Sequence, residues 1–346
     1  MEMSANYGVE KRRTDMSKVC IAGAGSWGLA LALVLEKNGH EVTVWSALPE
    51  EIALLKEEHE NKRCLPGVII PPIIKLTDDL KEALDDKDVI VMAVASPYTR
   101  STAAKFAPYI KDGQIIVDVA KGIEESSLHT LSQVIKEELP TAEVAVLSGP
   151  THAEEVSRFI PTTCVIGSEN EETACFLQNL FMNENFRIYT SSDVLGIEVG
   201  GSLKNVIALA AGIADGLGYG DNTKAALITR GIHEISRLGV AMGGRLQTFY
   251  GLTGMGDLIV TCASMHSRNR RAGILIGQGK TMKEAMDEVQ MVVEGVYSAK
   301  AALILARKYN IPMPITEKIN EILFEDKSAK DAVHELMVRD KKVEYE

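Results

Sequence analysis

The chain has 346 residues and a formal net charge of -11 at pH 7, and hydrophobic residues make up 46% of it. This length allows a sizeable core and about two domains. The acidic charge argues against non-specific binding to nucleic acid or to anionic membrane surfaces, because both need a basic field. The cysteines are scattered, odd in number and without the spacing of a metal site: Cys20, Cys64, Cys164, Cys175 and Cys262. They predict reduced thiols of a cytoplasmic protein, with no metal centre.

Residues 1–15, which precede Met16, contain no apolar pattern, so we expect a flexible extension. No stretch is expected to reach the length of a transmembrane helix, and the polar start lacks a signal-peptide core. A cytoplasmic protein without membrane insertion is therefore predicted.

Between residue 18 and about residue 190, short β-branched runs alternate with helical segments. Runs this apolar are typical of strands covered on both faces. They predict a Rossmann-type, doubly wound α/β fold with a mainly parallel sheet. The predicted strands are 19–22, 42–45, 89–94, 115–119, 144–147 and 164–166.

A glycine-rich segment, Gly23-Ala24-Gly25-Ser26-Trp27-Gly28, follows the first predicted strand and opens a helix that ends near residue 39. Its glycines permit a tight turn, close approach of a pyrophosphate, and close packing of helix on strand, while the helix N-terminus attracts the anion. The pattern alone is weak, but its position between a strand and a helix makes it a strong indication. We therefore expect residues 16–190 to form a dinucleotide-binding domain for NAD or NADP.

The second predicted strand ends in Trp45-Ser46-Ala47-Leu48. A site that prefers NAD would place an acid here for the ribose hydroxyls, and an NADP site would often place an arginine. Neither is present, so this turn leaves the choice between the two cofactors open. The missing acid also removes one barrier against a 2′-phosphate.

Two later strands also end in polar segments, Val119-Ala120-Lys121-Gly122 and Ser148-Gly149-Pro150-Thr151-His152-Ala153. Because ligands of open α/β sheets bind outside the carboxyl ends of the strands, both segments are expected at the nucleotide crevice. Lys121 can reach a phosphate or a reacting carbonyl there; the alternative is a solvated surface lysine. We expect His152 to pack or to cap a helix rather than to act in catalysis.

After Asp193 the pattern is helical only, which predicts an all-helical domain over 191–346 for substrate binding and catalysis. The cleft between the two domains is the expected ligand site. Glycine-rich links at 216–220 and 251–256 separate the helices. The predicted helices are 193–214, 223–240, 268–277, 282–287, 295–309, 315–323 and 330–338.

Between Glu198 and Asp215 the residues are mostly small or apolar, and Lys204 is the only charged one among them. In a helix, no residue one turn away from Lys204 can pair with its ammonium. One interpretation is a stem that covers apolar surface with its head in water. The other is a buried lysine, tuned toward neutral pH, that exchanges a proton with a substrate. Asp257 is then either its partner or a loop carboxylate in a flexible glycine turn.

The segment Ser267-Arg268-Asn269-Arg270-Arg271 starts one of the predicted helices. Ser267 is a candidate N-cap, and the guanidinium of Arg268 together with nearby amides makes a phosphate receptor in an otherwise acidic protein. The alternative is a solvated basic helix face.

Five segments in order resemble the bacterial-type NAD(P)-dependent glycerol-3-phosphate dehydrogenases, over about residues 18–324. The adjacent Arg268 and Asn269 suit a phosphate better than a simple carboxylate, which disfavours the related β-hydroxyacid and ketopantoate-type dehydrogenases. A non-enzymatic dinucleotide sensor is the remaining alternative, and it would not need Lys204 or Asp257. The five segments are GAGSWG at 23–28, AKG at 120–122, SGPTHAEEV at 148–156, GSLKNV at 201–206, and GDL with SRNRR at 256–258 and 267–271.

The resemblance implies reversible reduction of dihydroxyacetone phosphate to sn-glycerol 3-phosphate, the backbone of glycerophospholipids. Lys204 would be the catalytic proton donor and acceptor, and a homodimer through the helical domain is implied by analogy. Substrate contacts carry over to Lys121, Gly149, Thr151, Lys204, Asn205, Asp257, Thr261, Ser267, Arg268 and Asn269. Cofactor contacts carry over to Gly23, Gly25, Ser26, Trp27, Gly28, Lys121, Ala153, Arg268, Val292 and Glu294.

Four residues in three segments depart from the family pattern. Ala47 and Leu48 stand where an arginine is frequent after the second strand, which puts a strong preference for NADP in doubt. Ala95 replaces a common proline, and His152 replaces a usual phenylalanine. Neither of these two changes touches the expected chemistry.

Overall fold

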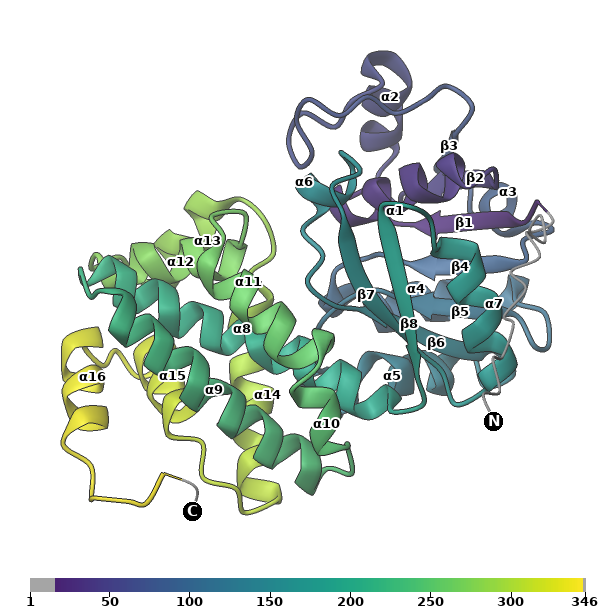
Figure 1. Cartoon of the computed structure of the whole chain (residues 1–346). Helices are drawn as coiled ribbons and strands as arrows, with labels where there is room; N and C mark the ends of the chain where they lie inside the picture. Colours follow the sequence, from purple (N-terminus) through teal and green to yellow (C-terminus); the bar gives the residue numbers. More distant parts are fainter. Residues whose placement is uncertain (1–15, 345–346) are drawn as a thin grey trace, which may run out of the picture.

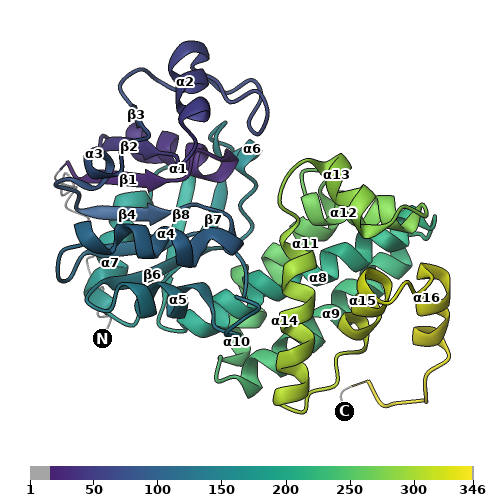
Figure 2. The same cartoon turned by 180° about the vertical axis from the view of Figure 1, so that it is seen from behind.

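The computed structural model describes residues 16–344, so the expected extension at 1–15 lies outside the described residues. Two bodies lie side by side, a sheet flanked by helices and an all-helical body (Figure 1), and the same division is seen from behind in Figure 2.

Eight strands form one sheet in the order β3-β2-β1-β4-β5-β6-β7-β8. All neighbouring strands are parallel except β6 and β7, which confirms the predicted mainly parallel sheet. Two strands were not predicted: β3 has three residues, and β8 alternates buried and exposed positions. The strands are β1 (Lys18–Ala22), β2 (Glu41–Trp45), β3 (Lys75–Thr77), β4 (Val89–Met92), β5 (Ile115–Asp118), β6 (Glu143–Ser148), β7 (Thr162–Gly167) and β8 (Phe186–Ser191).

Helices cover both faces of this sheet, which explains why its central strands are apolar throughout. Along β1, Val19 and Ile21 pack into the core that contains Leu29 of α1, whereas Cys20 and Ala22 face the opposite core with Phe106 of α4. The helices of this half are α1 (Ser26–Lys37), α2 (Pro49–Glu58), α3 (Leu80–Leu84), α4 (Thr99–Phe106), α5 (Leu131–Glu138), α6 (Ala153–Val156) and α7 (Glu171–Phe181), with 3-10 turns η1 (Ser96–Tyr98) and η2 (Ala107–Tyr109).

The described chain beyond β8 is helical, as predicted. The expected flexible link at 251–256 was wrong, because Gly254 packs tightly against the backbone of Phe249 and the segment forms a π-helical turn. The elements are α8 (Val194–Gly216), α9 (Asp221–Ala241), α10 (Leu246–Phe249), η3 (Leu252–Gly256), α11 (Asp257–Ala263), α12 (Arg268–Gly277), α13 (Met282–Val289), α14 (Glu294–Lys308), α15 (Pro314–Phe324) and α16 (Ala329–Met337).

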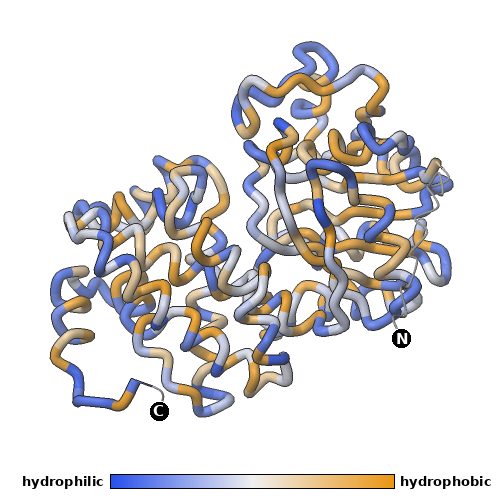
Figure 3. The backbone as a smooth tube through the Cα atoms, in the orientation of Figure 1, coloured by the Kyte–Doolittle hydropathy of each residue, from blue (hydrophilic) through white to orange (hydrophobic). Residues whose placement is uncertain are grey.

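Helix α8 forms the centre of the helical body, and hydrophobic residues gather along it and along the strands of the sheet (Figure 3). In residues 16–344 it is the one helix long and apolar enough to cross a membrane, so the expectation that no segment reaches that length was wrong. Its apolar window is 89% buried inside the protein, which accounts for its composition.

A buried carboxylate fixes the start of α8 to the sheet half. Glu198 is 7% exposed and accepts hydrogen bonds from the backbone N–H (2.8 Å) and the hydroxyl (2.6 Å) of Ser132 in the first turn of α5. These contacts hold the helix that carries Lys204 against the half that carries the glycine turn.

Candidate active site

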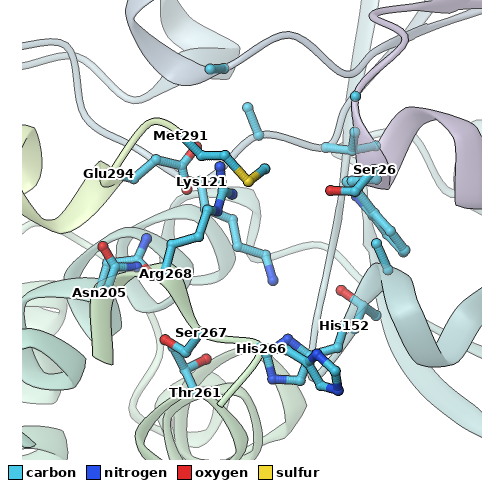
Figure 4. Close-up of a pocket in the computed structure, with 18 of the residues that line it drawn as sticks. Ser26, Lys121, His152, Asn205, Thr261, His266, Ser267, Arg268, Met291 and Glu294 are labelled. Atoms are coloured by element: carbon cyan, nitrogen blue, oxygen red, sulfur yellow. Dashed lines mark hydrogen bonds between the residues drawn. The ribbon is translucent and has the colours of Figure 1, made fainter. Parts of the chain in front are cut away.

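A cavity lies between the carboxyl ends of the sheet strands and the helical body. Elements from both halves contribute to its wall, and Figure 4 shows Ser26, Lys121 and Arg268 pointing into it. The predicted site residues that line the cavity are Gly25, Ser26, Trp27, Lys121, Thr151, Ala153, Lys204, Asn205, Asp257, Thr261, Ser267, Arg268, Asn269 and Glu294.

The glycine turn before α1 fits a pyrophosphate. Gly23 has a φ of +127°, and a Cβ there would lie 2.7 Å from the carbonyl oxygen of Ala93. A Cβ on Gly28 would overlap the carbonyl oxygen of Gly23, whereas a Cβ on Gly25 would meet nothing within 4 Å and would project into the cavity. The first turn of α1 has no acidic residue and no side-chain cap, so its N–H groups are available to an anion.

These glycines predict two different mutational effects. Gly28→Ala forces a methyl group against backbone and should destabilise the protein by about 1–3 kcal/mol. Gly25→Ala keeps a φ of -72°, which alanine tolerates, and should leave the melting temperature unchanged. It should nevertheless raise the Kd for NADH at least about tenfold, the equivalent of ~1.4 kcal/mol. Thermal unfolding and nicotinamide fluorescence measure the two effects, and equal loss of stability in both variants would contradict the assignment.

Lys204 is buried in the cavity wall, with 5% of its surface exposed. Its Nζ donates to Asp257 Oδ1 at 2.8 Å and to Thr261 Oγ1 at 2.7 Å. The interpretation of a stem with its head in water was therefore wrong, and Asp257 is the partner. Asp257 starts α11 and is 2% exposed, so it is not the carboxylate of a flexible loop.

Asp257 also holds a second ammonium, a contact that the sequence did not predict. Lys121, which follows β5, donates from Nζ to Asp257 Oδ2 at 2.7 Å and to the carbonyl oxygen of Gly149 at 2.9 Å. One carboxylate thus joins a lysine from the sheet half to a lysine from the helical half.

Burial and the neighbouring charges shift the pKa values of Lys204 and Asp257. Burial lowers the pKa of Lys204 to about 8, and Asp257 opposes this effect while the neighbouring Lys121 adds to it. Burial disfavours the charged form of Asp257, but the two ammonium groups and their hydrogen bonds outweigh it, and its pKa lies below the ordinary value. Lys204 is therefore placed to change its protonation state near neutral pH.

The start of α12 lies beside this cluster. Ser267 Oγ accepts a hydrogen bond from the Arg270 N–H (3.2 Å), which confirms the predicted N-cap. Asn269 donates to Asn205 Oδ1 (2.9 Å) and accepts from the Gly295 N–H (2.8 Å), so its amide joins α8, α12 and α14. Arg268 and Arg271 are the charged residues of this turn that line the cavity. Figure 4 shows Arg268 in the cavity wall.

Asn205 carries a buried donor without a partner among the described residues. It is 2% exposed, and within the described residues its Nδ2 has no hydrogen-bond partner. Because an unpaired buried donor is costly, this atom indicates a polar ligand group in the cavity.

Some predicted residues lie outside the cavity wall. Gly23 and Gly28 shape the turn from behind, and Gly149 contributes through its carbonyl oxygen. Val292 does not line the cavity, whereas its neighbours Met291 and Glu294 do. Burial raises the pKa of Glu294, and the positive charge of Arg268 opposes this.

Two histidines in the cavity wall were not predicted as site residues. His152 precedes α6 without capping it through its side chain, and its ring lies 5.8 Å from that of His266. Burial lowers the pKa of His152 to about 4, so the ring is neutral at physiological pH. The cap expected of His152 is absent, and its partly buried ring lines the cavity beside His266. Replacement of the usual phenylalanine was the one signal in the sequence that set this position apart.

The chain combines a sheet domain of the dinucleotide-binding type with a helical body that places a buried lysine in the cleft. This combination is typical of NAD(P)-dependent dehydrogenases. The family models of the NAD-dependent glycerol-3-phosphate dehydrogenase N-terminus and C-terminus match residues 18–174 and 193–334. The chain belongs to the NAD-dependent glycerol-3-phosphate dehydrogenase family.

The similarity to known proteins covers nearly the whole chain. Glycerol-3-phosphate dehydrogenase [NAD(P)+] of Agathobacter rectalis is 64% identical, over 95% of this chain and 98% of its own. The enzyme of Fusobacterium nucleatum is 62% identical, over 96% and 99%. The crystal structure of glycerol-3-phosphate dehydrogenase from Coxiella burnetii superposes with a TM-score of 0.90 at 38% identity, over 94% and 99%.

Proposed function

We propose that Lys204 is the proton donor and acceptor in the reaction of this enzyme, the reversible NAD(P)H-dependent reduction of dihydroxyacetone phosphate to sn-glycerol 3-phosphate. The product supplies the backbone for glycerophospholipid synthesis. The observation that carries the assignment is the buried cluster of Lys204, Asp257 and Lys121 in the cavity wall. Family membership removes the sensor and the β-hydroxyacid dehydrogenase as alternatives.

The glycine turn and the first turn of α1 would hold the nicotinamide cofactor, which would supply or accept a hydride at C2 of the substrate. As the carbonyl is reduced, its oxygen gains negative charge. The Lys204 ammonium stabilises this charge and donates a proton to the oxygen, which leaves Lys204 as a neutral amine. Asp257 and Thr261 hold Nζ in place through the step. In the oxidation direction, the neutral amine takes the hydroxyl proton.

Lys121 supplies a second positive charge beside the reacting oxygen. Its contacts with Gly149 and Asp257 fix the direction of its side chain, so the charge needs no reorganisation during the reaction. The unpaired Nδ2 of Asn205 is a donor for a substrate oxygen. Together these groups orient C2 toward the cofactor side of the cavity.

The phosphate group of the substrate is assigned to Arg268 and the first turn of α12. A guanidinium at a helix N-terminus combines a charge-assisted donor with N–H groups that favour an anion. Asn269 acts here as a positioning residue, because its amide is bound to Asn205 and Gly295. This differs from the direct phosphate contact expected of Asn269.

Arg268→Ala should raise the KM for dihydroxyacetone phosphate by about 10- to 100-fold, because a hydrogen bond to a charged group contributes about 1.5–3 kcal/mol. Arg307→Ala, which removes an exposed arginine from the last turn of α14, is the matched control and should leave KM unchanged. Steady-state kinetics with both cofactors measures the effect. An unchanged KM with only a lower melting temperature would favour a solvated basic face.

The reaction itself is tested by following nicotinamide absorbance after addition of dihydroxyacetone phosphate, with ketopantoate and unphosphorylated dihydroxyacetone as comparison substrates. Turnover that does not depend on the phosphate group would overturn the substrate assignment.

We also propose a cytoplasmic protein, because all five cysteines are free thiols. The boundary between domains at residues 190 and 191, and a homodimer through the helical body, stay predictions.

A further inference from the structure

The end of β2 is the place where dinucleotide-binding domains contact the ribose of the adenosine half. Here the Gly23 N–H donates to the carbonyl oxygen of Trp45 at 2.8 Å, so the glycine turn and the end of β2 lie side by side. Ser46 follows and is 5% exposed, and Ala47 and Leu48 carry no charge. The local sequence thus leaves this subsite without a carboxylate or a guanidinium.

Helix α2 places a carboxylate beside this subsite. Glu51 lies in its first turn, and Glu51 Oε2 accepts a hydrogen bond from the Ser46 hydroxyl at 2.7 Å. Since Ser46 also accepts from the Leu48 N–H (3.2 Å), its hydroxyl is held in one orientation. The acid missing from the strand end is replaced by an acid five residues further along the chain.

Asn61 connects the same carboxylate to the glycine turn. Its Nδ2 donates to the carbonyl oxygen of Ala24 at 3.2 Å and lies 3.4 Å from Glu51 Oε1. Its Oδ1 accepts from the Cys64 N–H at 3.2 Å, which fixes the amide. Glu51 is therefore hydrogen-bonded to the end of β2 and, through Asn61, to the loop assigned to the pyrophosphate.

We propose that Glu51, held by Ser46 and Asn61, selects NADH over NADPH. The inference rests on the proposed binding of the dinucleotide at the glycine turn. A carboxylate in this position accepts hydrogen bonds from the 2′- and 3′-hydroxyls of the adenosine ribose and repels a 2′-phosphate. Lys62 is paired with Glu58 (3.1 Å), and the remaining cation of this loop, Arg63, is exposed.

The test compares kcat/KM for NADH and NADPH at saturating dihydroxyacetone phosphate, together with direct binding of both nucleotides by fluorescence. The wild-type enzyme should prefer NADH at least about tenfold, because like charges that meet in a binding site cost more than the ~1.4 kcal/mol that corresponds to tenfold. Glu51→Gln keeps the shape of the side chain and should lower that preference at least about fivefold, mainly through tighter binding of NADPH.

Glu50→Gln is the matched control, because Glu50 is an exposed carboxylate in the same turn of α2. It removes the same charge and should leave the preference unchanged. A wild-type enzyme that uses NADPH as well as NADH would overturn the proposal even if Glu51→Gln fails to fold. Equal shifts in the two variants would overturn it as well. Absence of turnover with either nucleotide would instead contradict the proposed function.

Discussion

Lys204→Met is expected to lower kcat for reduction of dihydroxyacetone phosphate by at least about a hundredfold, the scale of a lost general acid. Methionine fills the space of the buried stem but has no proton to donate. The contact between Asp257 and Lys121 remains, so the fold and the binding of NADH should persist. Stopped-flow and steady-state kinetics measure the loss, and nicotinamide fluorescence measures the binding.

Lys318→Met provides the control for this variant. Lys318 is also a partly buried lysine of the helical body, with 18% of its side chain exposed and ion pairs to Glu321 and Glu335. It does not line the cavity, so its replacement should leave kcat unchanged. Full turnover by Lys204→Met would remove Lys204 from the mechanism.

Asp257→Asn should cost about 3 kcal/mol of folding free energy, because it leaves two ammonium groups without their shared counter-charge. It should also change the pH profile. In the proposed mechanism, reduction requires the ammonium form of Lys204, so the wild-type rate should be retained below the pKa of about 8 and fall as the pH rises through it. Without the carboxylate, the charge of Lys121 lowers the pKa further, and the decline begins at lower pH.

The control for Asp257→Asn is Glu234→Gln. Glu234 is 4% exposed and accepts from the backbone N–H groups of Ile315 (2.7 Å) and Thr316 (3.2 Å), and no lysine within residues 16–344 forms an ion pair with it. Its replacement should lower stability without moving the pH profile of the reduction. Chemical denaturation and rate–pH profiles separate the two effects. A decline at the same pH in wild type and Asp257→Asn would show that Asp257 does not control the protonation of Lys204.

The sequence predicted those strands whose burial produces a recognisable pattern of apolar residues. β1 and β4 are buried on both faces and appear as short apolar runs. β8, at the edge of the sheet, alternates buried and exposed residues through Arg187 and Tyr189, and no apolar run marks it. β3 is too short to show either pattern.

A site residue was predictable where the sequence of a single helix was enough to set it apart. Lys204 was set apart by its isolation on an apolar helix, and Ser267 by its place before a helix. The contact between Asp257 and Lys121 was not predictable, because these residues are 136 positions apart in the chain and meet only after the two halves assemble. The same holds for Glu51, whose contact with Ser46 depends on how α2 folds back over the end of β2.

The close packing of α8 on α12 has a consequence for how the enzyme tolerates substitution. A Cβ on Gly212 would overlap the carbonyl oxygen of Arg270, and a Cβ on Gly273 would overlap that of Leu209. The spacing between the helix that carries Lys204 and the helix that starts at Arg268 is thus set by main-chain contact. A single added methyl group at either glycine would move the two helices apart. In a selection for growth on this activity, both positions should therefore behave like active-site residues, although neither faces the cavity.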